Sequence, residues 1–195
     1  MNPTQRSLHA IAELLLSGPQ YRASGTIRLR VTPGGFGTTK APALRLDGEL
    51  LVADAATIAL PGRTYTDVAA ELGVEAGAAQ GVYADGSGVG PDETIVLEPA
   101  TTARVAGALA TGQEALRAFA PQENPTLWPE HFDVGIVVGA ANYGVSPGDG
   151  YSPEPYAYVG PHEPHRGEFW NAPFGAARPF RDAAGILAFF RAAPL

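Results

Sequence analysis

Hydrophobic and polar residues follow a helical period at the start of the chain. Apolar side chains recur at spacings of three and four over residues 8–15, so one face of this segment is apolar. Asn2 suits the N-cap, and Pro3 suits the first helical position, where its missing N–H costs nothing. Gly18 and Pro19 predict the end of this helix.

The next segment alternates apolar and polar residues with a period of two. Residues 26–32 place apolar side chains on one face and arginines on the other, which predicts a half-buried strand. Arg28 and Arg30 are therefore expected to face solvent or a polar groove. Asp47 and Gly48 predict a hairpin turn. Further strands are predicted over residues 43–47, 49–53, 57–60, 94–97, 134–138 and 155–159.

Helices and glycine-rich loops complete the pattern. Helices are predicted over residues 65–72, 101–119 and 180–191, and turns or loops over residues 34–40 and 81–93. Because the strands occur in hairpin-like groups, the expected class is α+β: a mostly antiparallel sheet with an N-terminal helix, a long central helix and a C-terminal helix. Residues 1–195 are expected to form a single domain. Any subdivision falls at residues 121–125, between an N-terminal half and an aromatic-rich C-terminal half.

Composition narrows the class of protein. The chain has 195 residues, is 45% hydrophobic and lacks cysteine, which excludes a disordered protein, a disulfide scaffold and thiol chemistry. A net charge of −7 disfavours nucleic acid and anionic membranes as partners. Residues 1–18 indicate a soluble helix rather than a signal peptide, and no apolar run is long enough to span a bilayer. We therefore expect a cytoplasmic protein, and its preference for arginine over lysine is typical of a high-GC bacterial genome.

Three ionisable residues precede the predicted strand at residues 134–138. On an extended segment, His131 and Asp133 point to one side and Glu130 to the other. His131 is a candidate catalytic acid or base, assisted by Asp133 or Glu130. The alternative is a structural role, in which these side chains hold the start of the strand by hydrogen bonds. Trp128 is then expected to be buried together with Phe132.

Two further motifs fail on physical grounds. Residues 144–148 match the G-x-S-x-G nucleophile elbow, but Pro147 lacks the backbone N–H that the oxyanion hole requires. His162 and His165 are flanked by prolines that keep their segment extended, so the two rings point to opposite sides. We therefore expect no metal and no cofactor.

Aromatic and amide side chains are concentrated in the last third of the chain. Such a mixture suits a concave ligand site with apolar walls and a few fixed polar groups. The alternative is that large rings fill gaps in an irregular core. The candidate ligand-binding residues are Trp128, Asn142, Tyr143, Tyr156, Tyr158, Trp170 and Asn171.

Three sequence blocks in this region resemble a known group of proteins. They are WPEHFD at residues 128–133, EPYAYVGP at 154–161 and FWNAPFG at 169–175. Together they are similar to a family of uncharacterised bacterial proteins that carry WPEHFD, EPYxYVGP and FWNAPFG blocks. The resemblance implies a shared fold. That family has no established activity, so the resemblance assigns no residue a role.

Three functions remain open at this point. The preferred one is a cytoplasmic domain that binds a small molecule in an aromatic-lined cleft. The second is an enzyme with His131 as acid or base. The third is an interaction or oligomerisation module, compatible with a homodimer, whose loops at residues 143–158 contact the partner. Aromatic side chains that line a pocket would favour one of the first two functions, and an exposed aromatic patch would favour the third. Rings that fill the core would favour a structural role.

Overall fold

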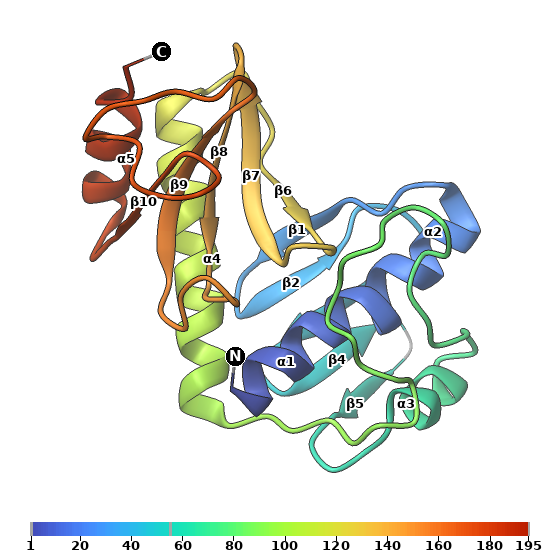
Figure 1. Cartoon of the computed structure of the whole chain (residues 1–195). Helices are drawn as coiled ribbons and strands as arrows, with labels where there is room; N and C mark the ends of the chain where they lie inside the picture. Colours follow the sequence, from blue (N-terminus) through green and yellow to red (C-terminus); the bar gives the residue numbers. More distant parts are fainter. Residues whose placement is uncertain (1, 55, 195) are drawn as a thin grey trace.

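The computed structural model describes residues 2–54 and 56–194. Within this part of the chain, ten strands form one antiparallel sheet in the order β10-β9-β8-β7-β6-β1-β2-β3-β4-β5, flanked by helices (Figure 1). The α+β class is therefore confirmed. The strands are β1 (Leu29–Thr32), β2 (Gly35–Thr38), β3 (Leu44–Asp47), β4 (Leu50–Ala53), β5 (Thr57–Ala59), β6 (Thr126–Trp128), β7 (Asp133–Val138), β8 (Ala141–Ser146), β9 (Tyr156–Pro161) and β10 (Ala176–Pro179). The helical segments are α1 (Pro3–Ala10), η1 (Ile11–Ser17), α2 (Gly18–Ser24), α3 (Tyr65–Glu71), α4 (Pro99–Phe119) and α5 (Ala183–Arg191).

The sheet connects two lobes. In Figure 1, β1–β5 and the N-terminal helices form one lobe, and β6–β10 with α5 form the other. The lobes join where β1 pairs with β6, with Leu29 opposite Leu127. Helix α4 packs against β1 and β2 as well as β7 and β8, and so spans both lobes. The predicted joint at residues 121–125 connects α4 to β6.

The N-terminal helix begins as predicted but ends later. The Asn2 side chain accepts the N–H of Gln5 at 2.8 Å, and the Gln5 side chain accepts the N–H of Asn2 at 3.2 Å. The predicted end is wrong because η1 is a π-helix, in which each N–H reaches five residues back. Pro19 has no N–H to give to the Leu14 carbonyl, which instead accepts the N–H of Gly77 at 3.0 Å. The helix therefore continues through α2.

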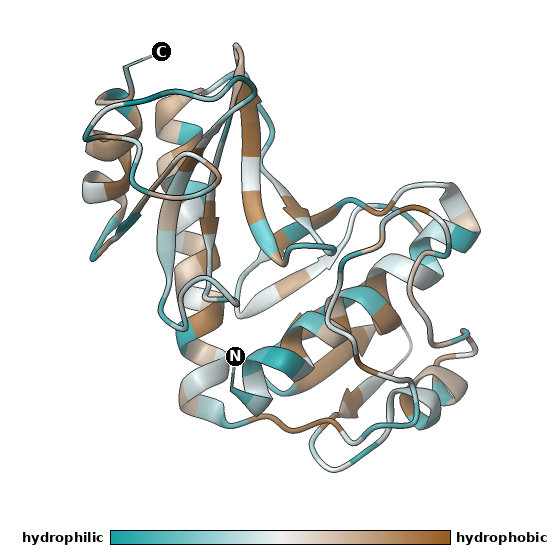
Figure 2. Cartoon of the chain, viewed as in Figure 1, coloured by the Kyte–Doolittle hydropathy of each residue, from teal (hydrophilic) through white to brown (hydrophobic). Residues whose placement is uncertain are grey.

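The alternating pattern of residues 26–32 predicts β1 in part, because the strand begins only at Leu29 and Ile27, before it, is half-buried. Leu29 and Val31 are buried, whereas Arg28 and Arg30 are exposed. The predicted apolar strand corresponds to β7, which lies inside the sheet between β6 and β8. Figure 2 shows β7 mostly hydrophobic, and Val134 and Ile136 of this strand are buried, whereas Val137 is exposed.

A glycine-rich segment forms a strand, contrary to prediction. Turns are predicted at residues 34–40, but β2 occupies Gly35–Thr38. An added Cβ at Gly35 would lie 2.4 Å from a carbonyl oxygen of β3, and one at Gly37 would lie 2.7 Å from another. The absent side chains let β2 approach the next strand, β3, and a turn pattern within residues 34–40 does not reveal this contact. Strands β6, β8 and β10 also lie outside the predicted set.

Residues 94–97 contact the N-terminal helix instead of forming the predicted strand. The Ser7 hydroxyl accepts the N–H of Val96 at 3.0 Å. Within the described residues, the segment's only sheet-like pairing is a single bridge between Thr64 and Thr94. The strand prediction is wrong because a helix side chain takes up this backbone group. None of the helices in residues 2–54 and 56–194 is long and apolar enough to cross a membrane.

Candidate functional site

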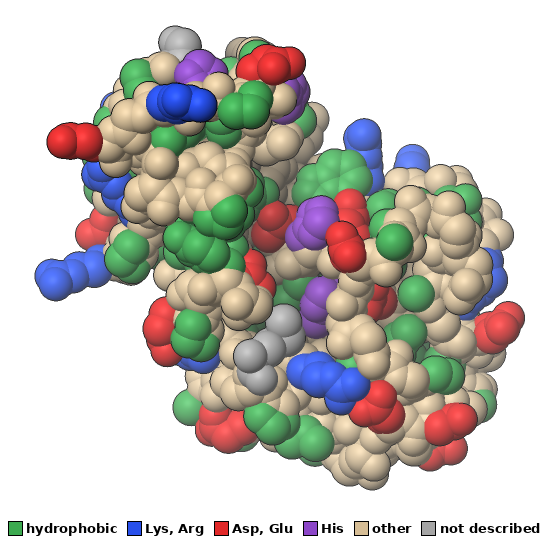
Figure 3. Space-filling model, in the orientation of Figure 1, with side chains coloured by type: hydrophobic (Ala, Val, Ile, Leu, Met, Phe, Trp, Pro, Cys, Tyr) green, Lys and Arg blue, Asp and Glu red, His purple; other side chains and the backbone are tan. Residues whose placement is uncertain are grey.

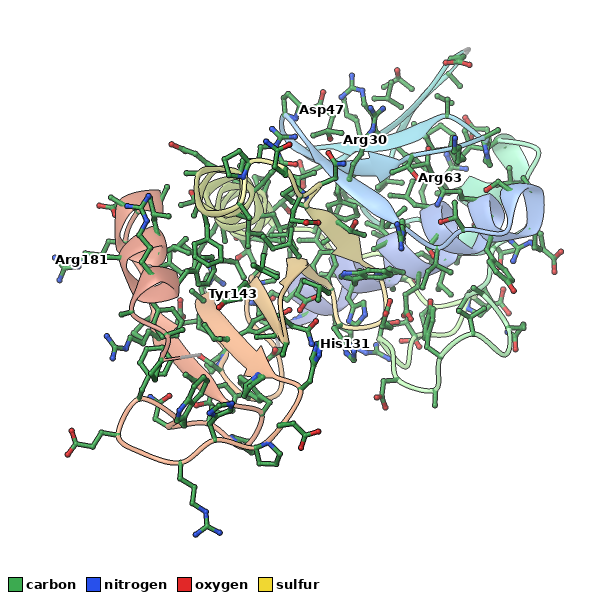
Figure 4. The ribbon with its side chains drawn as sticks, turned by 90° about the horizontal axis from the view of Figure 1, so that it is seen from above. Arg30, Asp47, Arg63, His131, Tyr143 and Arg181 are labelled. Atoms are coloured by element: carbon green, nitrogen blue, oxygen red, sulfur yellow. The ribbon has the colours of Figure 1, made fainter. Side chains whose placement is uncertain are left out.

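A cleft of about 630 Å³ opens beside the turn between β6 and β7. Its walls come from that turn, from β8 and β9, and from the loops that follow β8 and precede β10. Figure 3 shows histidine and acidic side chains gathered in the hollow between the lobes, and Figure 4 shows His131 between them. The lining residues are Trp128, Glu130, His131, Asp133, Asn142, Asp149, Tyr151, Tyr156, Tyr158, Gly160, Pro161 and Phe174.

A tight turn at residues 129–132 positions two of these side chains. Trp128 pairs with Asp133 across the hairpin, so the extended segment expected here is wrong. Phe132 closes the turn with φ of 53°, a left-handed conformation that non-glycine residues rarely adopt. Its buried ring stacks on His9, with 5.4 Å between ring centroids. His9 also donates from Nε2 to the carbonyl of the turn's first residue at 2.7 Å, which ties the turn to α1.

Trp128 and Phe132 are separated by this turn, contrary to the prediction that they are buried together. The Phe132 ring lies in the core, edge-on to Phe36 at 5.3 Å. Trp128 is half-buried and lines the cleft, with the Arg28 guanidinium 5.5 Å from its ring centroid. The structure thus places Trp128 at the candidate site and Phe132 beneath it.

Asp133 is the most deeply buried carboxyl group of the cleft. Its side chain is 7% exposed, and its Oδ2 accepts a short hydrogen bond from the Tyr158 hydroxyl. Its Oδ1 is buried and has no hydrogen-bond partner among the described residues. Burial raises the pKa of Asp133 to about 6, against the lowering effects of the Tyr158 hydrogen bond and of His131. The carboxylates of Glu130 and Asp149 raise it further.

Asp149, in contrast, is fully hydrogen-bonded. Its Oδ1 accepts the N–H groups of Tyr151 at 2.8 Å and Ser152 at 3.2 Å. Its Oδ2 accepts the hydroxyls of Ser146, at 3.1 Å, and of Tyr156. Asp149 therefore holds the loop after β8 in place. Ser146, the serine of the rejected nucleophile motif, stabilises this loop through its hydrogen bond to Asp149.

Four aromatic rings form a continuous wall on one side of the cleft. Tyr151 lies 5.3 Å from Tyr156 and 4.9 Å from Phe174, measured between ring centroids. Tyr158 lies 6.5 Å from Tyr156 and 6.2 Å from Phe174. Burial raises the pKa of both Tyr156 and Tyr158, and the carboxylates they contact raise it further. Both phenols are therefore neutral donors at ordinary pH.

Three of the predicted ligand-binding residues lie elsewhere. Tyr143 packs in the core against Phe119, 4.6 Å between ring centroids, because side chains alternate along β8 and its neighbour Asn142 takes the cleft face. Trp170 packs against Phe169 at 4.9 Å. Asn171 braces the β10 backbone through two hydrogen bonds to Ala177, of 2.9 and 3.1 Å.

Trp128, Asn142, Tyr156 and Tyr158 do line the cleft, as do Glu130, His131 and Asp133. The predicted set lacks five lining residues, which are Asp149, Tyr151, Gly160, Pro161 and Phe174. Each of them lies inside one of the three sequence blocks or within five residues of one, and that position is the signal that could have pointed to them. Among the described residues, no group of three or more His, Asp or Glu side chains is arranged to hold a metal ion.

A buried polar cluster lies beneath the turn. His9 Nε2 is 4.0 Å from Glu13 Oε2, and both side chains are almost fully buried. Burial lowers the pKa of His9, which favours the neutral ring, while Glu13 opposes this effect. Glu13 also accepts the N–H of Ser87 at 2.8 Å and so ties the glycine-rich loop to η1. Periodicity gives no hint of this cluster, because both residues lie outside the predicted apolar face, where the pattern favours exposure to solvent.

A second groove, of about 830 Å³, runs along α4 beside the β1–β2 and β3–β4 turns. Small residues of α4 form much of it, among them Ala103, Ala106, Gly107 and Ala110. Its described lining includes no aromatic ring and no buried carboxylate. We therefore treat the aromatic cleft as the candidate site.

No protein-family model, curated protein or solved structure matches this chain. The resemblance to the WPEHFD-containing family stays a prediction that rests on the three blocks. The structure brings parts of all three blocks to one place. Glu130 and Asp133 of the first block, Tyr158 of the second and Phe174 of the third line the same cleft.

Proposed function

We propose that this is a cytoplasmic domain that binds a small organic molecule in the cleft at the β6–β7 turn. The observation that carries the proposal is Asp133 Oδ1, a buried acceptor that no described residue satisfies, in a cleft walled by aromatic rings. A volume of about 630 Å³ lies in the range typical of small-molecule sites. Buried polar groups are normally hydrogen-bonded, so a vacant acceptor in a cleft favours a ligand that donates to it.

The two tryptophans make the proposal testable by NMR. Trp128 lines the cleft, whereas Trp170 packs against Phe169 outside it. We expect fragments that bind in the cleft to shift the indole N–H signal of Trp128 and to leave that of Trp170 in place. Trp128→Phe and Trp170→Phe variants assign the two signals. A diverse fragment library that shifts only the Trp170 signal, or neither signal, contradicts the proposal.

Catalysis is a second candidate function, and the pKa of Asp133 favours it. A carboxyl group with a pKa of about 6 is suited to general acid–base chemistry near neutral pH. Asp133 is then the acid or base, and the exposed His131 beside it is its partner. In a metabolite mixture followed by mass spectrometry, wild type should consume a compound that Asp133→Asn leaves unchanged. A mixture that both proteins leave unchanged contradicts catalysis.

A further inference from the structure

The cleft carries an excess of negative charge. Its lining includes the carboxyl groups of Glu130, Asp133 and Asp149, and the described part contributes no lysine or arginine to it. His131 is its one basic side chain within the described residues. An anionic ligand would therefore meet like charges, whereas a cation would meet opposite ones.

Two carboxylate oxygens of residues that line the cleft lack donors. Asp133 Oδ1 and Glu130 Oε2 are both buried, and neither has a hydrogen-bond partner in residues 2–54 and 56–194. The two groups lie close enough for Glu130 to raise the pKa of Asp133. Asp149 differs, since four donors already satisfy it. Asp133 and Glu130 therefore keep acceptor capacity that Asp149 has already used.

Tyr156 and Tyr158 present their rings to a ligand, because their hydroxyl protons are already donated to carboxylates. The Tyr158 hydroxyl donates to Asp133, and the Tyr156 hydroxyl donates to Asp149. What remains for a ligand is the aromatic wall that these rings form with Tyr151 and Phe174. Aromatic rings attract organic cations through their negative faces and bury apolar groups as well.

We propose that the cleft selects an organic cation: a protonated primary or secondary amine donates N–H to Asp133 Oδ1 and Glu130 Oε2, and its apolar body lies against the four aromatic rings. This inference rests on the proposed function, since it specifies the ligand of the same site. A quaternary ammonium ion satisfies the rings but has no N–H for the vacant oxygens, so the amine is the better ligand. A hydrated metal ion leaves the aromatic wall unused.

The test uses three probes that share a phenyl ring and differ in charge. Phenethylamine is cationic, 2-phenylethanol is neutral and 3-phenylpropionate is anionic. Binding is followed by the Trp128 indole signal, with Trp170 as the internal control. We expect the amine to bind at least about ten-fold more tightly than the other two, the ratio typical of one hydrogen bond to a buried charge. Its N,N,N-trimethyl derivative should bind more weakly than the amine.

Variants and pH assign the preference to Asp133. In Asp133→Asn the amine should lose about ten-fold in affinity while the alcohol is unaffected. The exposed Asp85→Asn, the same change outside the cleft, should alter neither. Groups facing Asp133 are Tyr158 on β9, Glu130 and His131 on the turn, and Asp149 on the loop after β8. Since the pKa of Asp133 is about 6, amine affinity in wild type should rise about ten-fold from pH 5 to pH 7, and Asp133→Asn should lose this rise.

Tyr158→Phe keeps the ring and removes the hydrogen bond that holds the pKa of Asp133 down. It should therefore move the pH dependence to higher pH without abolishing amine binding. It also provides a second reading if Asp133→Asn folds poorly. Equal or tighter binding of the alcohol, the carboxylate, Mg²⁺ or Zn²⁺ at the Trp128 signal overturns the amine proposal but keeps the proposed function. If none of these probes shifts that signal, the amine proposal is overturned, and the fragment library then decides whether the proposed function also fails.

Discussion

Replacing Asp133 by asparagine should stabilise the empty protein at neutral pH. The new side chain would still accept the Tyr158 hydroxyl, because its amide oxygen takes the place of Oδ2, but it has no charge to bury. In the wild type, Asp133 is 7% exposed and its second oxygen has no partner among the described residues. An ionised carboxylate in such a place destabilises the folded state.

The pKa of Asp133 sets the size of the effect. In the folded state it is raised from 3.8 to about 6, so the folded protein binds this proton more tightly than the unfolded chain does. The stability that the protonated group contributes is fully present below pH 3.8 and is lost as pH rises through 6. The raised pKa therefore lowers the free energy of unfolding by about 3 kcal/mol at pH 7.5 and by about 1 kcal/mol at pH 4.5, compared with a group whose pKa does not change on folding.

Urea denaturation of both proteins at these two pH values measures the effect. We expect Asp133→Asn to be more stable by up to about 3 kcal/mol at pH 7.5, and by about 2 kcal/mol less than that at pH 4.5. Burial lowers the pKa of His9, so protonation of His9 destabilises both proteins as pH falls, and this effect cancels in the comparison. A variant no more stable than wild type at pH 7.5, or an advantage that persists at low pH, refutes this reasoning.

Other residues give further predictions, each measured by urea denaturation. His9→Ala should lower the free energy of unfolding by about 2 kcal/mol, because it removes a buried hydrogen bond and a ring stacked beneath the turn. A decrease of no more than about 0.5 kcal/mol would show that His9 does not hold the turn in place. Trp128→Ala should fold, and its free energy of unfolding should fall by less than the roughly 3–5 kcal/mol typical of a fully buried tryptophan, because Trp128 is only half-buried. His131 is exposed, so His131→Ala should change the free energy of unfolding by no more than about 0.5 kcal/mol. Gly112→Ala should cost about 1–3 kcal/mol, because the new Cβ would lie 2.7 Å from a β8 side chain. Gly107→Ala, in open space on the same helix, is the matched control and should stabilise; equal effects at the two glycines would contradict the close packing of α4.

Local patterns predicted those elements whose cause is local. The alternation at residues 26–32 correctly exposes Arg30 in β1 and Arg28 just before it, because neighbouring side chains of an extended segment point to opposite faces. The start at Asn2 is likewise determined by a contact between residues three apart. Such features depend on chain geometry alone, and the sequence pattern contains all the information they need.

Other elements depend on contacts that local patterns do not contain. Pro19 is tolerated because a distant N–H takes over the carbonyl it leaves free. Gly35 and Gly37 form a strand because β3 approaches them closely. The same limit applies within the site. Aromatic content indicated a cleft, but the register of β8 decides that Asn142 faces it and Tyr143 does not.

The position of Asp133 connects stability with the proposed ligand. At neutral pH the empty protein holds this carboxylate in a place that disfavours its charge, and asparagine would fit the same hydrogen bond from Tyr158. Sites that bind or react often reduce stability in this way, because the group they present to a ligand is left unsatisfied without it. A protonated amine would donate to the vacant oxygen and favour the ionised form. The same substitution should therefore stabilise the empty protein and weaken the complex, and a purely structural aspartate would not produce these opposite effects.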